Sequence, residues 1–357
     1  MFAARTLAAF AAVLVLMTAG ARAEPVPIGV GGLPHAGNDE ESAISKELGL
    51  NFITESAPWD EPKEGDYAWA DIKDPTDDPF GERLRKLKGQ GCTLSVTLKV
   101  VDDDKKHMPF YLEGKPLDDP KVLARWQAFL KAFLERYGDS IDYLNFGQKV
   151  NAYFAKHEAE WPAFAKFVAA GVQVARKDKP KLSVGVGLKD TDDPVKYWRD
   201  LAPGCGHLAL AYMAPCSVFT KQPTSQAIDP RQGVYFGKVF DSLLRLGGKK
   251  LLLTEVGCTS HASLDSSPEI QAQFITALFA WLRQSEGRVA AVSYICDKDW
   301  PYEASKTALR QALGDDILKY RGVIRLLTSE GLRFEDGKKK PAYDAFKKAV
   351  ELYRGKR

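Results

Sequence analysis

Residues 250–256 have the sequence KLLLTEV, and residues 268–282, shortly after them, carry apolar side chains at three- and four-residue spacing. The first pattern is a short aliphatic run without alternation, which is typical of a β-strand buried on both faces of a parallel sheet. The second is typical of a helix with one apolar stripe. Together the two stretches predict one strand-and-helix unit of an α/β fold.

The same unit recurs along the chain. Residues 201–206 are short for a crossover, so an irregular fifth helix is expected there. Eight strands alternating with helices predict a single α/β domain, a closed (β/α)8 TIM barrel. An open doubly wound sheet is the alternative, and the lack of a GxGxxG loop after the first strand counts against its nucleotide-binding form. The other predicted strands are residues 27–32, 51–55, 93–100, 141–147, 182–187, 208–213 and 289–296, and the other predicted helices are residues 122–136, 161–176, 232–246 and 342–353.

Residues 1–23 have the features of a secretory signal peptide. Arg5 is basic, residues 7–17 form a short apolar run, and Ala21-Arg22-Ala23 has the small-residue spacing of a cleavage site. A bilayer takes about 20 apolar residues to cross, so a membrane-anchoring helix is the less favoured alternative. We therefore expect a periplasmic or secreted protein, with one barrel domain over residues 24–357 and no membrane contact in the mature form.

The composition argues against nucleic acid as a partner. Lys and Arg number 50 against 47 Asp and Glu, which gives a formal charge of +3. The one basic cluster, Lys338-Lys339-Lys340, adjoins a predicted turn and is interpreted as solvated. A nucleic-acid-binding surface would need a larger basic patch.

Cysteine usage argues against a metal site. The odd number of cysteines leaves at least one thiol unpaired within an exported monomer, and no CxxC pair is present to suggest zinc. We expect most of these residues to be buried, with one disulfide such as Cys205–Cys216 left open as an alternative. The five are Cys92, Cys205, Cys216, Cys258 and Cys296.

A (β/α)8 barrel carries its active site at the carboxyl ends of its strands. Glu255 ends the strand at residues 250–256 and is expected to point into the barrel mouth. A carboxylate in that place is costly unless it has a function or a counterion. Glu255 is therefore either a catalytic candidate or the partner of a nearby lysine.

Other strand ends add candidates for binding a sugar. We expect Tyr212, Tyr294 and Trp300 to line the mouth, while Trp59 and Trp69 are either stacking platforms or ordinary packing aromatics. Gly147-Gln148-Lys149-Val150-Asn151 closes the strand at residues 141–147.

In this order the strand ends resemble the large barrel clan of retaining glycoside hydrolases, which includes cellulases, mannanases and endo-galactanases. Residues 59–69 are similar to the clan's W-x-x-x-E-P-x-x-G-x-Y-x-W pattern, and residues 254–257 are similar to its T-E-x-G nucleophile motif. Residues 331–343 resemble its closing segment. The resemblance implies a carbohydrate partner, Glu255 as nucleophile, Tyr212 as its hydrogen-bond donor, Gln148 and Asn151 as substrate-binding residues, and no cofactor or metal.

One departure from the clan's pattern concerns the proton donor. Where the clan has G-N-E with the glutamate as acid/base, this chain has Gly147-Gln148-Lys149. Retaining hydrolysis needs two carboxyl groups about 5–5.5 Å apart. Lys149 cannot readily act as the base, and Glu255 beside it is expected to hold it charged as an ion pair.

Three functions follow from this substitution. The chain is a glycan-binding barrel with impaired or altered retaining hydrolysis, an active glycosidase with another proton donor, or a non-enzymatic structural or interaction domain. General acid/base help is worth about 10²–10⁴-fold, so the first function implies slow reaction of ordinary sugars. For the second, the candidate donors are Glu158, Asp102, Asp103 and Asp297.

Overall fold

The computed structural model describes residues 25–31, 39–67, 69, 72, 77–103, 105–191, 193–214, 234–246, 248–285, 287–313 and 321–355. The predicted signal peptide and Cys216 lie outside these residues. Within them, no helix combines the length and the hydropathy that crossing a bilayer requires.

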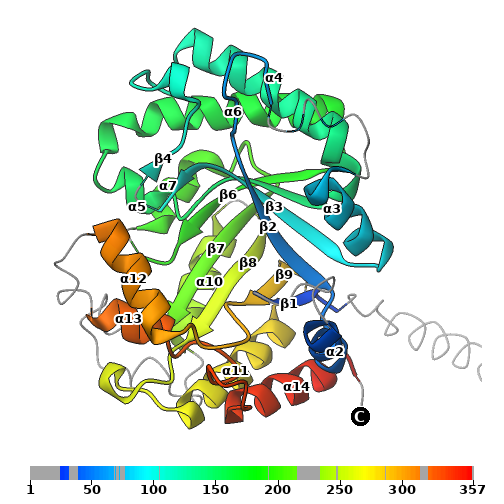
Figure 1. Cartoon of the computed structure of the whole chain (residues 1–357), viewed down its shortest axis with the longest axis vertical. Helices are drawn as coiled ribbons and strands as arrows, with labels where there is room; N and C mark the ends of the chain where they lie inside the picture. The colour runs from blue at the N-terminus through cyan, green and yellow to red at the C-terminus, as the bar shows by residue number, and fades with distance from the viewer. Residues whose placement is uncertain are drawn as a thin grey trace, which may run out of the picture.

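Eight parallel strands form the centre of the molecule (Figure 1). Hydrogen bonding connects them in the order β1-β9-β8-β7-β6-β5-β3-β2, so the sheet curls from the last strand back to the first. The predicted fold class, a single (β/α)8 barrel, is confirmed. The strands are β1 (Ile28–Val30), β2 (Phe52–Pro58), β3 (Thr93–Asp102), β5 (Tyr143–Gln148), β6 (Ser183–Lys189), β7 (His207–Ala214), β8 (Lys250–Cys258) and β9 (Val289–Tyr294), and β4 (Lys105–Lys106) pairs antiparallel with β3.

Asn51 closes the seam between the two ends of this sheet. Its backbone N–H donates to the Ile28 carbonyl at 2.8 Å, and its side-chain Oδ1 accepts from the Ile28 N–H at 3.0 Å. The same Oδ1 accepts from Arg354 at 2.8 Å, and the Asn51 carbonyl accepts from Thr93 at 2.8 Å. Asn51 therefore connects β1, β3 and the C-terminus. It does so at the seam between β1 and β2, which no strand ladder joins among the described residues.

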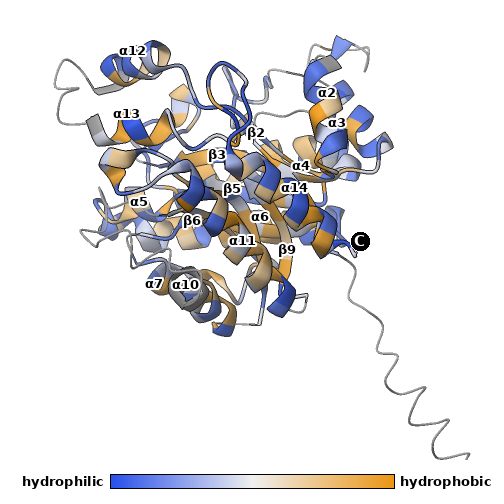
Figure 2. Ribbon diagram, turned by 90° about the horizontal axis from the view of Figure 1, so that it is seen from below, coloured by the Kyte–Doolittle hydropathy of each residue, from blue (hydrophilic) through white to orange (hydrophobic). Residues whose placement is uncertain are grey.

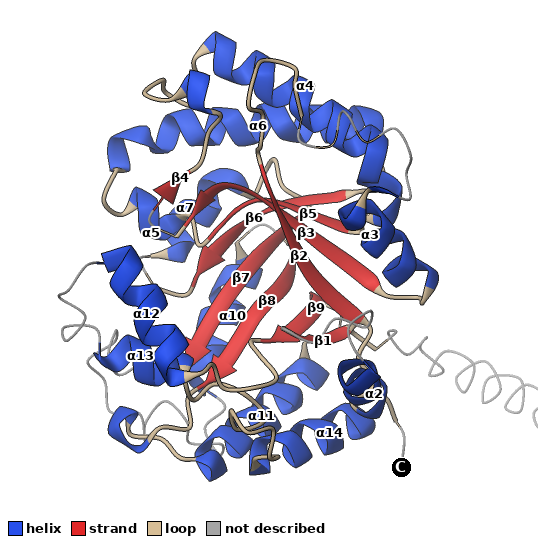
Figure 3. Ribbon diagram, viewed as in Figure 1, coloured by secondary structure: helices blue, strands red, loops and turns tan. Residues whose placement is uncertain are grey.

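Helices cover the outside of the barrel with their apolar faces inward (Figures 2 and 3). The longest of them start with proline at the first turn, where its missing N–H costs nothing. The helices are α2 (Asp39–Glu47), α3 (Pro79–Gly89), α4 (Pro120–Tyr137), α5 (Asn151–Phe154), α6 (Trp161–Asp178), α7 (Pro194–Leu201), α10 (Val234–Arg245), α11 (Pro268–Gln284), α12 (Tyr302–Leu313), α13 (Arg321–Leu327) and α14 (Pro341–Tyr353).

The fifth crossover differs from the expectation. The helix is α7 at Pro194–Leu201, so residues 201–206, where the crossover was expected, contain only its last residue and a turn at residues 202–206 that leads into β7. Asp193 caps the helix by accepting from the Lys196 N–H at 3.2 Å, and Pro194 follows it. The cap and the proline are the start signal that places the helix earlier.

Asn51→Ala should open the seam between β1 and β2. The substitution removes an acceptor shared by Ile28 and Arg354, and an unpaired partly buried donor costs about 1–3 kcal/mol. We expect urea denaturation to show a loss of unfolding free energy in that range. Lys131→Ala, on the exposed face of α4, serves as the control and should change little; an equal loss in both variants would contradict the assignment.

Candidate active site

A polar cavity of about 300 Å³ opens toward the carboxyl ends of the strands. A larger hollow of about 700 Å³ lies at the other end of the barrel, around Ile141–Tyr143 and Lys181–Ser183, far from any predicted site residue. The first cavity is the candidate site because it contains Glu255. Its lining residues are Thr54, Glu55, Ser56, Thr97, Lys99, Gln148, Thr254 and Glu255.

A β-bulge in β8 presents Glu255 to this cavity. Leu253 pairs with Leu210 but Glu255 pairs with Ala211, so Thr254 is an extra residue that re-aims the side chains after it. The Glu255 Oε2 lies 2.7 Å from the Lys149 ammonium, and its Oε1 accepts a hydrogen bond from the Gln148 amide. The expected Lys149–Glu255 ion pair is therefore present.

The backbone after β5 aims Lys149 at Glu255. Lys149 has φ +51, in the left-handed region that costs a non-glycine residue about 1–3 kcal/mol. Gly147 before it has φ +84, and a Cβ there would lie 2.5 Å from Val150 and 2.8 Å from the Val101 carbonyl. The turn therefore requires glycine at position 147, and it holds Lys149 in a strained backbone conformation.

The charge of Lys149 is stabilised by its surroundings. Burial by itself disfavours the ammonium, but Glu255, and beyond it Asp103 and Asp102, outweigh burial and raise the pKa of Lys149. Lys149 is therefore a cation at neutral pH, and it neutralises Glu255 in the resting site.

Beneath the cavity, the barrel interior holds a neutral hydrogen-bonded network. His207 shares a hydrogen bond with Asn145 Oδ1 through Nε2 at 2.8 Å, and another with Ser183 through Nδ1 at 2.9 Å. Asn145 then donates to Ser95 at 3.0 Å. Burial lowers the pKa of His207 to about 3, so the ring is uncharged. The network fills the barrel with polar atoms without adding charge to the site.

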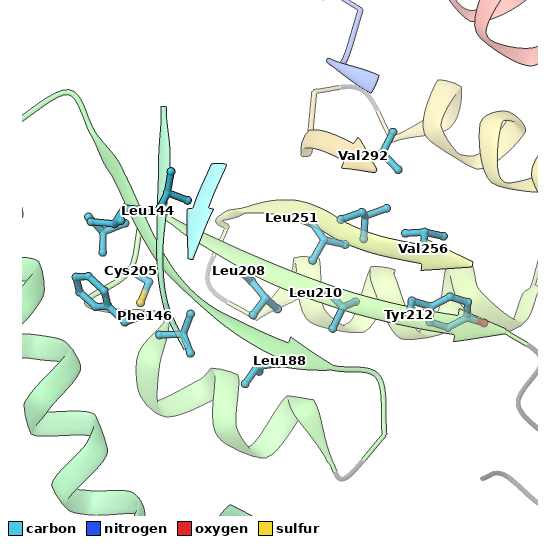
Figure 4. Packing of buried hydrophobic residues seen from close by; sticks show 14 of the residues in the cluster. Leu144, Phe146, Leu188, Cys205, Leu208, Leu210, Tyr212, Leu251, Val256 and Val292 are labelled. Carbon is cyan, nitrogen blue, oxygen red and sulfur yellow. The ribbon is translucent and has the colours of Figure 1, made fainter. Parts of the chain in front are cut away.

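Two predicted mouth aromatics lie elsewhere. Tyr212 follows Leu208 and Leu210 along the side of β7 that faces the helices (Figure 4), and its ring packs on Phe240 and Phe274. Strand alternation explains the error, because a shift of one residue changes the face. Met213, not Tyr212, points to the mouth side, where it packs with the Leu264 and Leu326 cluster. The hydrogen bond from Tyr212 to Glu255 is therefore not available.

Tyr294 is likewise buried on the helix side, at 1% exposure. Its hydroxyl accepts from the Gln271 amide at 3.0 Å, and its ring packs against Phe346 of α14. The prediction that Tyr294 binds sugar is wrong for the same reason of strand alternation.

The tryptophan pattern after β2 is structural. Trp59 is 3% exposed and packs against Trp126, Phe129 and Phe167, so its predicted role as a stacking platform is wrong. Trp69 stacks on Tyr67. Trp59 directly follows the last residue of β2, and at that point its side chain is directed toward α4 and α6 and not into the cavity.

Glu61 holds the same loop in place. Its carboxylate accepts from the Gly65 N–H at 2.6 Å and forms an ion pair with Arg125 of α4. The resemblance to the clan in this stretch therefore reflects loop architecture.

Gln148 and Asn151 have different roles. Gln148 touches Glu255 and lines the cavity as predicted. Asn151 is fully buried; its amide donates to the carbonyls of Lys189 and Thr191 and its oxygen accepts from the Lys189 N–H. Asn151 thus ties α5 to the end of β6, and its predicted role in substrate binding is wrong.

Trp300 is the predicted aromatic that remains exposed. Its side chain is 52% accessible, in the segment that leads from β9 to α12. Tyr302, the first residue of α12, is 50% accessible and adds apolar surface next to it in the chain. α12 and α13 lie beside the carboxyl ends of β7 and β8 (Figure 3), so the segment that carries Trp300 leads into a helix on the mouth side.

None of the alternative proton donors named from the sequence is free. Glu158 pairs with Lys196 at 2.5 Å, Asp102 with Lys99 at 3.1 Å, and Asp103 with Lys189 at 3.8 Å. Asp297 is buried in an ion pair with Arg333. Their carboxylates are engaged as counterions.

A carboxyl group that the sequence analysis missed lies next to Glu255 instead. Glu330 is 1% exposed, and burial raises its pKa to about 8. Nearby, Lys340 is buried and binds Asp299 at 2.7 Å, so the interpretation of the lysine triplet as solvated is wrong for this member. Both residues come from the irregular segment between α13 and α14, where no periodic pattern marks a buried position.

The cysteines described by the structure are buried free thiols. These are Cys92, Cys205, Cys258 and Cys296. Over the same described ranges, no group of three or more His, Cys, Asp or Glu side chains could hold a metal ion.

No protein-family model and no curated protein matches this chain. Solved structures do. An exo-β-1,4-mannosidase from Opitutaceae bacterium strain TAV5 superposes with a TM-score of 0.65 at 18% identity, over 92% of this chain and 60% of that one. The fold is a glycoside hydrolase-like (β/α)8 barrel. This chain therefore spans less than two thirds of that mannosidase.

Two further structures share the barrel. A GH5 protein from Streptomyces cattleya in complex with Manβ1-4GlcNAc gives a TM-score of 0.65 at 16% identity, over 94% of this chain and 82% of that one. A psychrophilic family 10 endo-β-1,4-xylanase gives 0.60 at 15% identity, over 91% and 96%. At identities this low, the superpositions establish a common fold.

Glu255→Gln should make Lys149 more reactive. Glu255 is the largest influence that opposes burial, so its removal should lower the pKa of Lys149 relative to the wild type and leave more free amine at a given pH. We expect acetic anhydride to label Lys149 several-fold faster than in the wild type at about pH 7, where Glu330 is still protonated, measured by peptide mass spectrometry. Exposed Lys131 is the internal control, and an unchanged Lys149 rate would contradict the ion pair.

Proposed function

We propose that this chain is an exported, carbohydrate-binding glycoside hydrolase-like protein that retains the nucleophile Glu255 and has lost ordinary proton donation. The observation that carries the proposal is the 2.7 Å contact between Lys149 and Glu255 at the carboxyl ends of β5 and β8. In this proposal, Lys149 stands at the place from which retaining hydrolases supply their second carboxyl group. The resting nucleophile is consequently neutralised.

The chemistry open to this site follows from its charges. Glu255 can attack an anomeric carbon once a sugar displaces Lys149 from its carboxylate, and Gln148 remains as a hydrogen-bond donor beside it. Lys149 is a poor acid while Glu255 is ionised, so the leaving group departs without efficient protonation. Sugars with good leaving groups should react, and ordinary glycosides should mainly bind.

Two features of the mouth support a sugar ligand over a purely structural role. The cavity is open and lined by hydroxyl, amide and charged groups that can hydrogen-bond to a polyol. Trp300 offers an exposed ring on the same side of the barrel. A structural domain would be expected to fill its mouth with packed side chains.

A 2-fluoro aryl glycoside with a good leaving group should label Glu255. The first step then needs no acid, and the fluorine slows hydrolysis of the ester, so a covalent adduct accumulates. We expect a mass gain in the intact protein from at least one sugar of a panel, and peptide mapping to Glu255. Glu255→Gln is the control and should gain nothing. The absence of an adduct from every sugar, together with no binding on a glycan array, would refute the proposal.

Lys149→Glu should restore hydrolysis of the sugar that labels Glu255. A carboxyl group at this position supplies general acid/base catalysis, which is worth about 10²–10⁴-fold. We expect a gain of that order in kcat/KM for an unactivated glycoside. Lys149→Gln removes the ammonium without supplying an acid, so it should gain far less; equal rates in the two variants would count against the assignment.

A further inference from the structure

Glu330 is a buried carboxyl group whose hydrogen-bonding capacity is not satisfied by the described residues. It follows α13, and its Oε1 has no hydrogen-bond partner among the described residues. A Cβ built on Gly257 would lie 3.6 Å from this Oε1, and Gly257 is two residues beyond Glu255 on β8. Glu330 therefore lies over the strand that carries the proposed nucleophile. An unpaired buried oxygen is expensive, and such a group calls for an explanation.

Two ion pairs interact electrostatically with this carboxyl group. One is Lys149–Glu255, and the other is Lys340–Asp299, each at 2.7 Å. Burial is the largest cause that raises the pKa of Glu330 to about 8; Glu255 and Asp299 act in the same direction, and Lys149 and Lys340 oppose them. Glu330 is therefore protonated at neutral pH and ionises in mildly alkaline solution.

The other titratable groups that face Glu330 are neutral. Burial raises the pKa of Cys258, Cys296 and Tyr294, which interact electrostatically with Glu330. None of them supplies a counterion when Glu330 ionises. The cations in range are Lys149 and Lys340.

The two cations differ in how firmly they are held. Lys340 is fully buried, and besides Asp299 it donates to the Ser260 hydroxyl at 3.0 Å and the Ser329 carbonyl at 3.2 Å. Lys149 is partly exposed, and its ion pair in the described structure is with Glu255. An ionised Glu330 would therefore be stabilised mainly by attraction to the Lys149 ammonium.

We propose that Glu330 and Glu255 share the Lys149 ammonium, so that ionisation of Glu330 weakens the hold of Lys149 on Glu255 and makes Glu330 a positioning residue for the nucleophile. The proton of Glu330 leaves to solvent, and no other group changes its covalent state. The consequence for reaction at Glu255 rests on the proposed function, but the sharing itself does not. It would give the site a second carboxyl group that acts through Lys149 without touching the sugar.

Labelling of Lys149 in wild type and Glu330→Gln tests the sharing without any substrate. Above about pH 8, ionised Glu330 adds a negative charge that keeps Lys149 protonated, so acetic anhydride should label wild-type Lys149 several-fold more slowly than the variant. Below about pH 7 the ratio of the two rates should approach one. A ratio that stays constant with pH would reveal a merely structural effect and overturn the proposal. Lys131 is the internal control.

The pH dependence of Glu255 trapping tests the consequence for the nucleophile. With a sugar that labels Glu255, the wild-type rate should rise several-fold through about pH 8, while the Glu330→Gln rate stays flat. Glu61→Gln, which alters a buried carboxyl group outside the site, should keep the rise. A wild-type profile identical to that of Glu330→Gln overturns the proposal and leaves the proposed function intact. A lack of adduct in all variants refutes the proposed function, and the Lys149 labelling ratio still decides the sharing.

Discussion

The parallel arrangement of the strands is the constraint on which the rest of this structure depends. A parallel strand cannot be reached by a tight turn, so each crossover returns to the same end of the barrel and all carboxyl ends meet at one rim. Glu255 at the end of β8 and Lys149 after β5 are distant in sequence, yet the rim places them 2.7 Å apart. The closeness of Glu255 and Lys149 therefore follows from the parallel strand order and not from a local sequence motif.

Charge then determines what this rim can do. A (β/α)8 barrel with two carboxyl groups at its mouth can divide acid and nucleophile between them, because their environments separate the pKa values. Here the Lys149 ammonium lies beside Glu255, so the positive and negative charges of this ion pair cancel. The other described acids at the rim are counterions of Lys99, Lys189, Lys149 and, for Glu55, Arg83, whereas Glu330 forms no ion pair among the described residues and one of its oxygens has no hydrogen-bond partner there.

Several residues that looked functional turned out to hold the scaffold. Trp59, Asn151 and Tyr294 share one property: their side chains satisfy packing or backbone hydrogen bonds between neighbouring crossovers. Aromatic and amide side chains serve sugar binding and helix packing equally well, so their type does not distinguish the two uses. The two uses are distinguished by the strand face on which the residue lies, or by the direction in which the following loop leads it.

The sequence by itself determined the eight strands, the main covering helices and the position of Glu255, because burial on both faces and amphipathic periodicity leave local patterns. The prediction that Lys149 stands in the place of an acid also comes from the sequence, through its resemblance to the clan's pattern. Only the tertiary structure decided which way Tyr212 points, since a bulge or one-residue shift reverses a strand's faces. It alone decided that Glu330 and Lys340 are buried beside the site, because irregular segments have no period and their burial is set by distant contacts.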